Sequence, residues 1–230
     1  MIIKVCGMRD AKNIQEVAEL GIDLMGFIFY PKSPRYVQMI SSQAGIIPDY
    51  SEERFRSVAY GERPSAVGVQ RVGVFVDEMP QSIITRVYNY KLDYVQLHGQ
   101  ERPVMIENLR RTLVPDLTPH IKIIKVISVA GAEDVKRCND YEGLVDLFLF
   151  DTKSPELGGS GRQFGWDVLQ TYDGQTPFLL SGGIGPDDVA QIKAFHHPQF
   201  AGIDLNSKFE TAPAVKDVDL LRQFIQAVRA

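Results

Sequence analysis

Short runs of apolar residues recur along the chain and alternate with longer segments whose apolar residues are three or four positions apart. The runs show little polar alternation, which is typical of strands that are covered on both faces of a parallel sheet. Eight such runs predict eight strands, at residues 2–5, 24–29, 71–76, 94–97, 121–127, 147–150, 178–180 and 201–205.

The segments between the runs carry helix signals. Asp10 is a plausible N-cap for a helix that continues through Leu20 and stops at Gly21. Pro80 suits the first position of another helix. The remaining helices are predicted at 41–47, around Ile106, Leu109 and Leu113, at 132–139, from Trp166, from Pro186, and around Val218, Leu221, Ile225 and Val228; the helix at Pro80 is expected to bury Ile83, Ile84, Val87 and Tyr88.

Alternation of strands and helices predicts a parallel sheet with helices outside it. Eight units within 230 residues fit a closed (β/α)₈ barrel. The expected fold class is therefore α/β, with one TIM-barrel catalytic domain over residues 1–230. Residues 48–66 are polar and irregular, too short for a domain and too long for an ordinary connection, which indicates a surface insertion.

Charge and cysteine content narrow the class of protein. The formal net charge is −4 and no basic block occurs, so we expect no nucleic-acid partner. Two cysteines, Cys6 and Cys138, form neither a disulfide framework nor a C-x-x-C metal pair. The first residues lack the features of a signal peptide, and no apolar stretch is long enough to span a membrane. We expect a soluble protein of the cytoplasm that does not contact membranes.

In a barrel of this kind, catalytic and binding residues lie at the carboxyl ends of the strands. Asp151 ends a buried run and is followed by a loop that contains Gly159 and Gly161, whose amides can hold an anion. Gly182 and Gly183 precede a predicted helix, an arrangement that suits phosphate. The candidates at the strand ends and in these loops are Cys6, Arg35, His98, Asp151, Gly159, Gly161, Gly182, Gly183, Asp204, Asn206 and Ser207.

Each candidate also has a purely structural interpretation. A cysteine beside a strand is usually an inert core residue, which is our interpretation of Cys138. Asp151 can cap its loop, Arg35 can be a surface charge between prolines, and His98 can satisfy local hydrogen bonds. Asp204 remains open between substrate contact and structural bonding.

Seven motifs, in order from end to end, resemble the phosphoribosylanthranilate isomerase family of tryptophan biosynthesis. They are K-V-C-G at 4–7, G-F-I-F-Y-P-K-S-P-R-Y-V at 26–37, V-G-V-F-V at 72–76, V-Q-L-H-G at 95–99, F-D-T-K-S-P-E-L-G-G-S-G at 150–161, S-G-G-I at 181–184 and G-I-D-L-N-S at 202–207. The resemblance implies a single barrel that converts N-(5-phosphoribosyl)anthranilate, an aminoaldose, to the aminoketose by an Amadori rearrangement.

The resemblance also implies roles. Cys6 is expected to be the general base, Asp151 the general acid, and Arg35 the partner of the anthranilate carboxylate. The phosphate is expected to bind the glycines after the sixth and seventh strands, with Asn206 and Ser207, while His98 and Asp204 are further candidates for substrate contact. No metal or cofactor is implied, because proton transfers complete the reaction; the partner is a small phosphosugar, and the protein is expected to be a monomer or a homodimer.

Some positions depart from the family pattern, and two rival functions remain. Gly165 stands where relatives often have Asp, Lys208 replaces a glycine of the last motif, and the 48–66 segment is longer than usual. One rival is another phosphosugar isomerase, such as that of histidine synthesis, which a paired Asp–Asp arrangement would favour. The other is a barrel that binds phosphate without catalysis.

Overall fold

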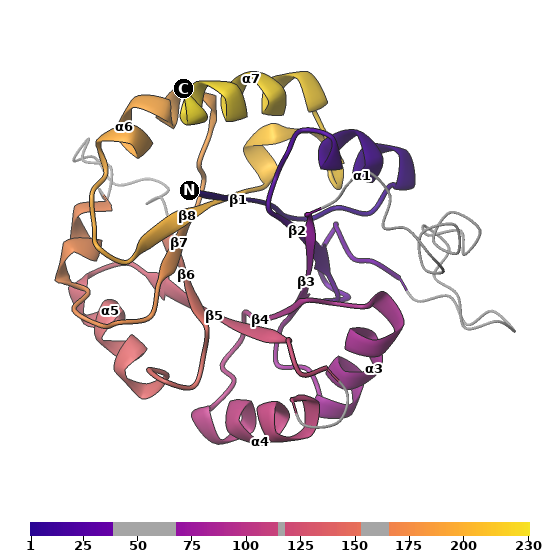
Figure 1. Ribbon diagram of the computed structural model, residues 1–230, viewed down its shortest axis with the longest axis vertical. Helices are drawn as coiled ribbons and strands as arrows, with labels where there is room; N and C mark the ends of the chain where they lie inside the picture. The colour runs from indigo at the N-terminus through magenta and orange to yellow at the C-terminus, as the bar shows by residue number, and fades with distance from the viewer. Residues whose placement is uncertain (39–67, 115–117, 153–165) are drawn as a thin grey trace, which may run out of the picture.

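A computed structural model describes residues 1–38, 68–114, 118–152 and 166–230. Eight parallel strands close into a barrel in the order of the chain, with β1 hydrogen-bonded to β8, and the helices form a ring around it (Figure 1). The predicted α/β barrel is confirmed. The strands are β1 (Ile2–Val5), β2 (Leu24–Ile28), β3 (Gln70–Phe75), β4 (Tyr94–Leu97), β5 (Lys122–Val129), β6 (Leu147–Thr152), β7 (Phe178–Ser181) and β8 (Phe200–Leu205).

The helical layer agrees with the predicted order, but several segments are shorter or tighter than expected. The predicted helix at 41–47 and the predicted insertion at 48–66 lie outside the described residues. The elements are α1 (Ala11–Ala18), α3 (Pro80–Tyr90), α4 (Pro103–Leu113), α5 (Ala132–Val135), α6 (Val189–Ala194) and α7 (Val218–Arg229), with 3₁₀ turns η1 (Lys136–Asp140), η2 (Trp166–Thr171), η3 (Pro186–Asp188) and η4 (Ser207–Phe209).

Local chemistry explains where these helices start. The Asp10 side chain accepts a hydrogen bond from the Asn13 amide at 2.8 Å, which satisfies one of the free N–H groups of α1. Proline opens α3, as predicted, because its missing N–H has no partner there in any helix. One expectation is wrong: Tyr88 is 74% exposed, and Tyr90 is buried in its place. Tyr88 follows directly after buried Val87, so it turns toward solvent while Tyr90 turns back toward the core.

Two apolar layers follow from the alternation of side chains along each strand. The larger one lies between the strands and the helices and includes Phe148, Phe150 and Phe178. A smaller cluster contains the alternate strand residues Leu24, Val72, Tyr94, Ile124, Val126, Leu147, Leu149 and Leu179, and we assign it to the inside of the barrel. Residues that continue this alternation beyond the last cluster member of a strand therefore lie at the carboxyl-terminal mouth.

A two-stranded hairpin, β9 (Glu210–Ala212) and β10 (Val215–Lys216), stands between β8 and α7 and was not among the predicted elements. Asn13 of α1 fixes it, donating to the Lys216 carbonyl at 2.9 Å and accepting from the Lys216 amide at 2.8 Å. This hairpin carries two charged side chains into the site described below.

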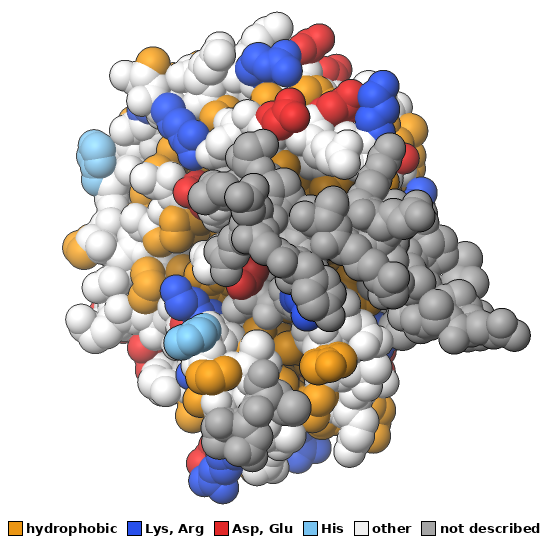
Figure 2. Space-filling model, turned by 45° about the vertical axis from the view of Figure 1, so that its right-hand side comes forward, with side chains coloured by type: hydrophobic (Ala, Val, Ile, Leu, Met, Phe, Trp, Pro, Cys, Tyr) orange, Lys and Arg blue, Asp and Glu red, His pale blue; other side chains and the backbone are white. Residues whose placement is uncertain are grey.

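The molecular surface has a mixed character. In Figure 2, basic and acidic side chains are interspersed over the visible face. Among the helices in the described ranges, none combines the length and the apolar character needed to cross a lipid bilayer.

Candidate active site

The carboxyl ends of β1, β4, β6, β7 and β8 bring the predicted polar residues to one end of the barrel. Asp151 lies two residues after Leu149 of the inner cluster, and Ser181 lies two residues after Leu179. Asp151 is the fifth residue of β6 rather than a loop residue, so the strand is longer than the sequence predicted. Strand geometry, which places alternate residues on one face, thus explains why these groups share the barrel mouth.

Cys6 is only 4% exposed, and its amide donates to the Leu205 carbonyl at 2.9 Å. The space for its thiol comes from Gly26 on the neighbouring strand, since a Cβ at that position would lie 2.7 Å from Cys6 Sγ. Gly7 then turns the chain with φ +80°, a conformation that favours glycine. The chain is therefore built closely around the thiol.

Lys4 lies two residues before Cys6 and is fully buried. Its Nζ donates to Asp204 Oδ1 at 2.8 Å, and Ser181 Oγ donates to Asp204 Oδ2 at 3.3 Å. A buried ion pair of this kind needs further hydrogen bonds to offset the loss of hydration. These contacts give Asp204 a structural role, and they place a buried cation on the strand that carries the thiol.

Several groups act on the Cys6 thiol in opposite directions. Burial raises the pKa of Cys6 above its ordinary value, and Asp204 raises it further, whereas Lys4 and Lys216 lower it. For Lys4, burial lowers the pKa, but Asp204 and Cys6 more than compensate and leave it raised. The thiolate therefore depends on nearby positive charge.

Asp151 and His98 face each other across the mouth. His98 Nε2 lies 3.6 Å from Asp151 Oδ2, and both side chains are about one third exposed, at 35% and 29%. The other ring nitrogen of His98 lies 3.5 Å from Gln96 Nε2. This pair is open to solvent, in contrast to Cys6.

Arg35 is held by a carboxylate of the protein itself. Its Nε donates to Glu210 Oε1 at 2.8 Å and its Nη2 donates to Glu210 Oε2 at 2.6 Å, a bidentate arrangement. Burial opposes ionisation of Glu210, yet hydrogen bonds from Arg35 and Lys216 keep its pKa below the ordinary value. Lys216 Nζ donates to Glu210 Oε1 at 2.7 Å and to Asn206 Oδ1 at 2.8 Å.

The glycines after β7 form an open corner. Gly182 and Gly183 have φ values of +100° and +79°, and a Cβ added to Gly183 would meet nothing within 4 Å. Ser207 and Lys208 are exposed in η4, and Gly185 lies against the Lys208 side chain. Backbone amides without a covering side chain can approach an anion closely. Gly159 and Gly161 lie outside the described residues, as does Gly165, which departs from the family pattern.

Three buried residues of the site were missed by reasoning from the sequence: Lys4, Glu210 and Lys216. Alternation along the first strand was a usable signal for Lys4, because it assigns residues 4 and 6 to the same face. Glu210 and Lys216 had no comparable signal, since the strands of the hairpin that carries them contain only three and two residues.

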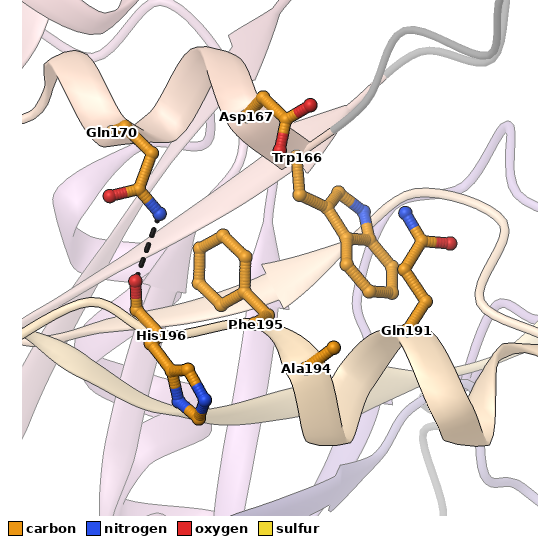
Figure 3. Close-up of a pocket in the computed structure, with 7 residues that line it drawn as sticks. All are labelled: Trp166, Asp167, Gln170, Gln191, Ala194, Phe195 and His196. Carbon is orange, nitrogen blue, oxygen red and sulfur yellow. Dashed lines mark hydrogen bonds between the residues drawn. The ribbon is translucent and has the colours of Figure 1, made fainter.

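A separate cavity of about 240 Å³ lies in the helical layer between η2 and α6 (Figure 3). Trp166, Asp167, Gln170, Gln191, Ala194, Phe195 and His196 line it. Gln170 Nε2 donates to the His196 carbonyl at 2.9 Å across it. None of the predicted site residues lines this cavity, so it is distinct from the barrel mouth.

Comparisons with known proteins agree along the whole chain. A family model for N-(5'-phosphoribosyl)anthranilate (PRA) isomerase matches residues 3–227. The N-(5'-phosphoribosyl)anthranilate isomerase of Parabacteroides distasonis is 44% identical over 228 residues, which cover 99% of this chain and 93% of that protein.

Two solved structures show the same architecture. One is a phosphoribosyl anthranilate isomerase in complex with reduced 1-(o-carboxyphenylamino)-1-deoxyribulose 5-phosphate, with a TM-score of 0.74, 29% identity, and coverage of 100% of this chain and 99% of that chain. The other contains monomers of the dimeric enzyme from Thermotoga maritima, with a TM-score of 0.71, 28% identity, and full coverage of both chains.

Proposed function

The chain belongs to the N-(5'-phosphoribosyl)anthranilate isomerase family, and we propose that Cys6 and Asp151 perform the two proton transfers of its reaction. The enzyme isomerises N-(5'-phosphoribosyl)anthranilate to 1-(2-carboxyphenylamino)-1-deoxyribulose 5-phosphate in tryptophan biosynthesis. The observation that carries the proposed roles is that a buried thiol directly after β1 and an accessible carboxyl group on β6 lie at the same mouth of the barrel.

Ring opening comes first. Asp151 donates a proton to the furanose ring oxygen as the bond from that oxygen to C1 breaks, which leaves an iminium between C1 and the anthranilate nitrogen. A carboxyl group serves as an acid only while it holds its proton. The accessible position of Asp151 suits this role, since the carboxyl can regain its proton from solvent, and His98 at 3.6 Å is placed to influence that exchange.

Isomerisation follows at C2. The Cys6 thiolate takes the C2 proton, the electrons of that C–H bond form the C1=C2 double bond, and the iminium nitrogen receives the displaced pair. Protonation of C1 with loss of the enol proton then gives the ketone. The thiolate is the form of Cys6 that can take this proton, and Lys4 and Lys216 favour that form against the burial that opposes it.

Arg35 is the proposed partner of the substrate carboxylate. A guanidinium carries five N–H donors. In Arg35, the Nε–H and one N–H of Nη2 donate to Glu210. The Nη1 edge is the part of the fork that we assign to the anthranilate carboxylate. Glu210 then fixes the orientation of the guanidinium before substrate arrives.

The phosphate is proposed to bind the glycine corner after β7. The positive φ values of Gly182 and Gly183 and the open space above Gly183 support this assignment. Asn206 and Ser207, which follow β8, complete the proposed site on one side. We assign the other side to Gly159 and Gly161, outside the described residues.

The chain is further proposed to act as one catalytic domain, and as a monomer or a homodimer. The described side chains of the site come from one chain, so a single copy supplies them. A dimeric relative is known from Thermotoga maritima. We infer that the protein works in the cytoplasm, because a catalytic Cys6 must stay a free thiol, and reducing compartments maintain that state.

The activity and the role of Asp151 can be tested together. Freshly prepared N-(5'-phosphoribosyl)anthranilate is fluorescent, and its loss reports turnover by the wild type and by Asp151→Asn. We expect rapid loss with the wild type and a fall of roughly 10²–10⁴-fold in kcat for the variant, the usual contribution of a general acid. Wild-type turnover in Asp151→Asn would remove the acid role; a folded wild type without turnover would point to the rival barrels.

A further inference from the structure

Five charged side chains near Cys6 form two ion-paired groups that we together call the charge cluster: Lys4 with Asp204, and Arg35 and Lys216 with Glu210. Lys4, Asp204, Lys216 and Arg35 interact electrostatically with Cys6. The ion pairs within these groups measure 2.8 Å from Lys4 to Asp204, 2.6 Å from Arg35 to Glu210 and 2.7 Å from Lys216 to Glu210. Their side chains are at most 18% exposed, and those of Lys4 and Lys216 are fully buried. Charges held this far from water interact strongly.

The cluster wraps the turn that carries the thiol. A Cβ on Gly7 would lie 2.6 Å from Arg35 Cδ and 2.8 Å from Asn206 Oδ1, so both side chains press against the residue after Cys6. Lys216 Nζ is hydrogen-bonded to that same Asn206 Oδ1 at 2.8 Å. Lys216 is thus tied through one amide group to the Cys6–Gly7 turn.

The charges of the cluster do not cancel. Among the described residues of the site, three cations face two carboxylates, which leaves one positive charge while Cys6 is a neutral thiol. An unbalanced buried charge is costly. Ionisation of Cys6 brings the total of the cluster and the thiol to zero.

Lys216 is the surplus cation. Lys4 pairs with Asp204, which also accepts from the neutral Ser181 hydroxyl, and Arg35 holds both oxygens of Glu210. Lys216 shares Glu210 Oε1, which already accepts from Arg35, and its other acceptor in the described part of the chain is the neutral Asn206 amide. Burial lowers the pKa of Lys216 despite Glu210, and the negative charge of an ionised Cys6 raises it, as expected for a cation that lacks a full partner.

We propose that Lys216 is a positioning residue for the reaction, whose ammonium stabilises the Cys6 thiolate; this inference rests on the proposed role of Cys6 as the base. When the thiolate takes the C2 proton, an S–H bond forms as the C2–H bond breaks, and the cluster regains its single positive charge. The hairpin β9–β10, held by Asn13 of α1, exists in part to deliver this charge.

A matched pair of substitutions tests the proposal. Lys216→Met removes the cation and Glu210→Gln removes a carboxylate, each with little change of shape. The ionisation of Cys6 is followed by NMR of an isotope-labelled cysteine β-carbon across pH, and its signal is identified by its absence in Cys6→Ala.

We expect the pKa of Cys6 to rise by about one unit or more in Lys216→Met, a tenfold loss of thiolate at a given pH, and to fall in Glu210→Gln. General damage to the site would move both variants in one direction. Shifts of the same sign, or no shift in either folded variant, would overturn the proposal. If Lys216→Met does not fold, the test rests on Glu210→Gln: a lower pKa of Cys6 supports the proposal, and an unchanged or higher pKa overturns it.

Kinetics provides a second readout. The pH at which kcat/KM rises with thiolate formation should move upward in Lys216→Met. A higher KM with an unchanged pH profile and an unchanged Cys6 titration would assign the surplus charge to the substrate carboxylate and refute the thiolate role. The titration needs no turnover, so its outcome is separate from the test of Cys6 as the base, which fails if Cys6→Ala stays active.

Discussion

Gly26 on β2 has no side chain, and this leaves room for the Cys6 thiol. A Cβ on Gly26 would lie 2.7 Å from Cys6 Sγ and 3.1 Å from Cys6 Cα, contacts too short to accept without movement of β1. Gly26→Ala should therefore displace the thiol, lower kcat, and cost about 1–3 kcal/mol of stability, as overpacking does.

Gly131→Ala is the matched control for that substitution. Gly131 has extended backbone, and a Cβ there would meet nothing within 4 Å. Urea unfolding and the fluorescence assay on both variants should show a loss only for Gly26→Ala. A stable, fully active Gly26→Ala would contradict the close fit around Cys6.

Cys138 gives a prediction about alkaline stability. Burial raises its pKa from 9.0 to about 12, so the folded chain keeps a proton that the unfolded chain loses above pH 9. The stabilising contribution is complete below about pH 9 and declines by about 1.4 kcal/mol per pH unit between 9 and 12. Urea unfolding at pH 8 and pH 10 should show about 1.4 kcal/mol less decline for Cys138→Ala than for the wild type; equal declines would contradict the assignment.

Single residues were predictable where the pattern of the strand marked them. Asp10 as a cap follows from its side chain and the helix after it, and Asp151 follows from the end of an apolar run. Lys4 was missed because a lysine inside an apolar strand is ordinarily exposed, and only the paired Asp204, two hundred residues away, makes its burial tolerable. Glu210 as the partner of Arg35 depends on a contact of the same long-range kind.

At the scale of elements, the residue directly after α3 has an unfavourable backbone conformation. Lys91 closes this helix in the left-handed conformation, with φ 49° and ψ 54°, where a side chain is unfavourable. Lys91→Gly should raise the free energy of unfolding by about 0.5–1 kcal/mol, the relief of strain less the entropy cost of glycine. Lys91→Ala retains its Cβ and should gain little, so equal gains in thermal unfolding would contradict the explanation.

Strands were easier to predict than the segments that connect them. Apolar runs located all eight barrel strands, with bounds that agree to within two residues. The helix predicted at 132–139 breaks into α5 and the 3₁₀ turn η1, and the one from Trp166 is a 3₁₀ turn. Such short segments depend on their packing against the barrel, which local spacing does not report.

At the scale of the whole molecule, the candidate active site combines residues from both ends of the chain. Barrel closure pairs β1 with β8, so Lys4 lies opposite Asp204 and Cys6 donates to Leu205. The order of the eight strands was enough to predict that residues at their carboxyl ends meet. Which of them pair with one another, and that the charge cluster carries one surplus cation, required the three-dimensional structure.

The measurement that tests this account most directly is the turnover of N-(5'-phosphoribosyl)anthranilate by Cys6→Ala beside the wild type. Binding of reduced 1-(o-carboxyphenylamino)-1-deoxyribulose 5-phosphate serves as the check that the site is intact. We predict a fall in kcat of roughly 10²–10⁴-fold with binding largely retained, because the variant lacks the base and keeps the groups that hold the substrate. Turnover like that of the wild type in the folded variant would contradict the account.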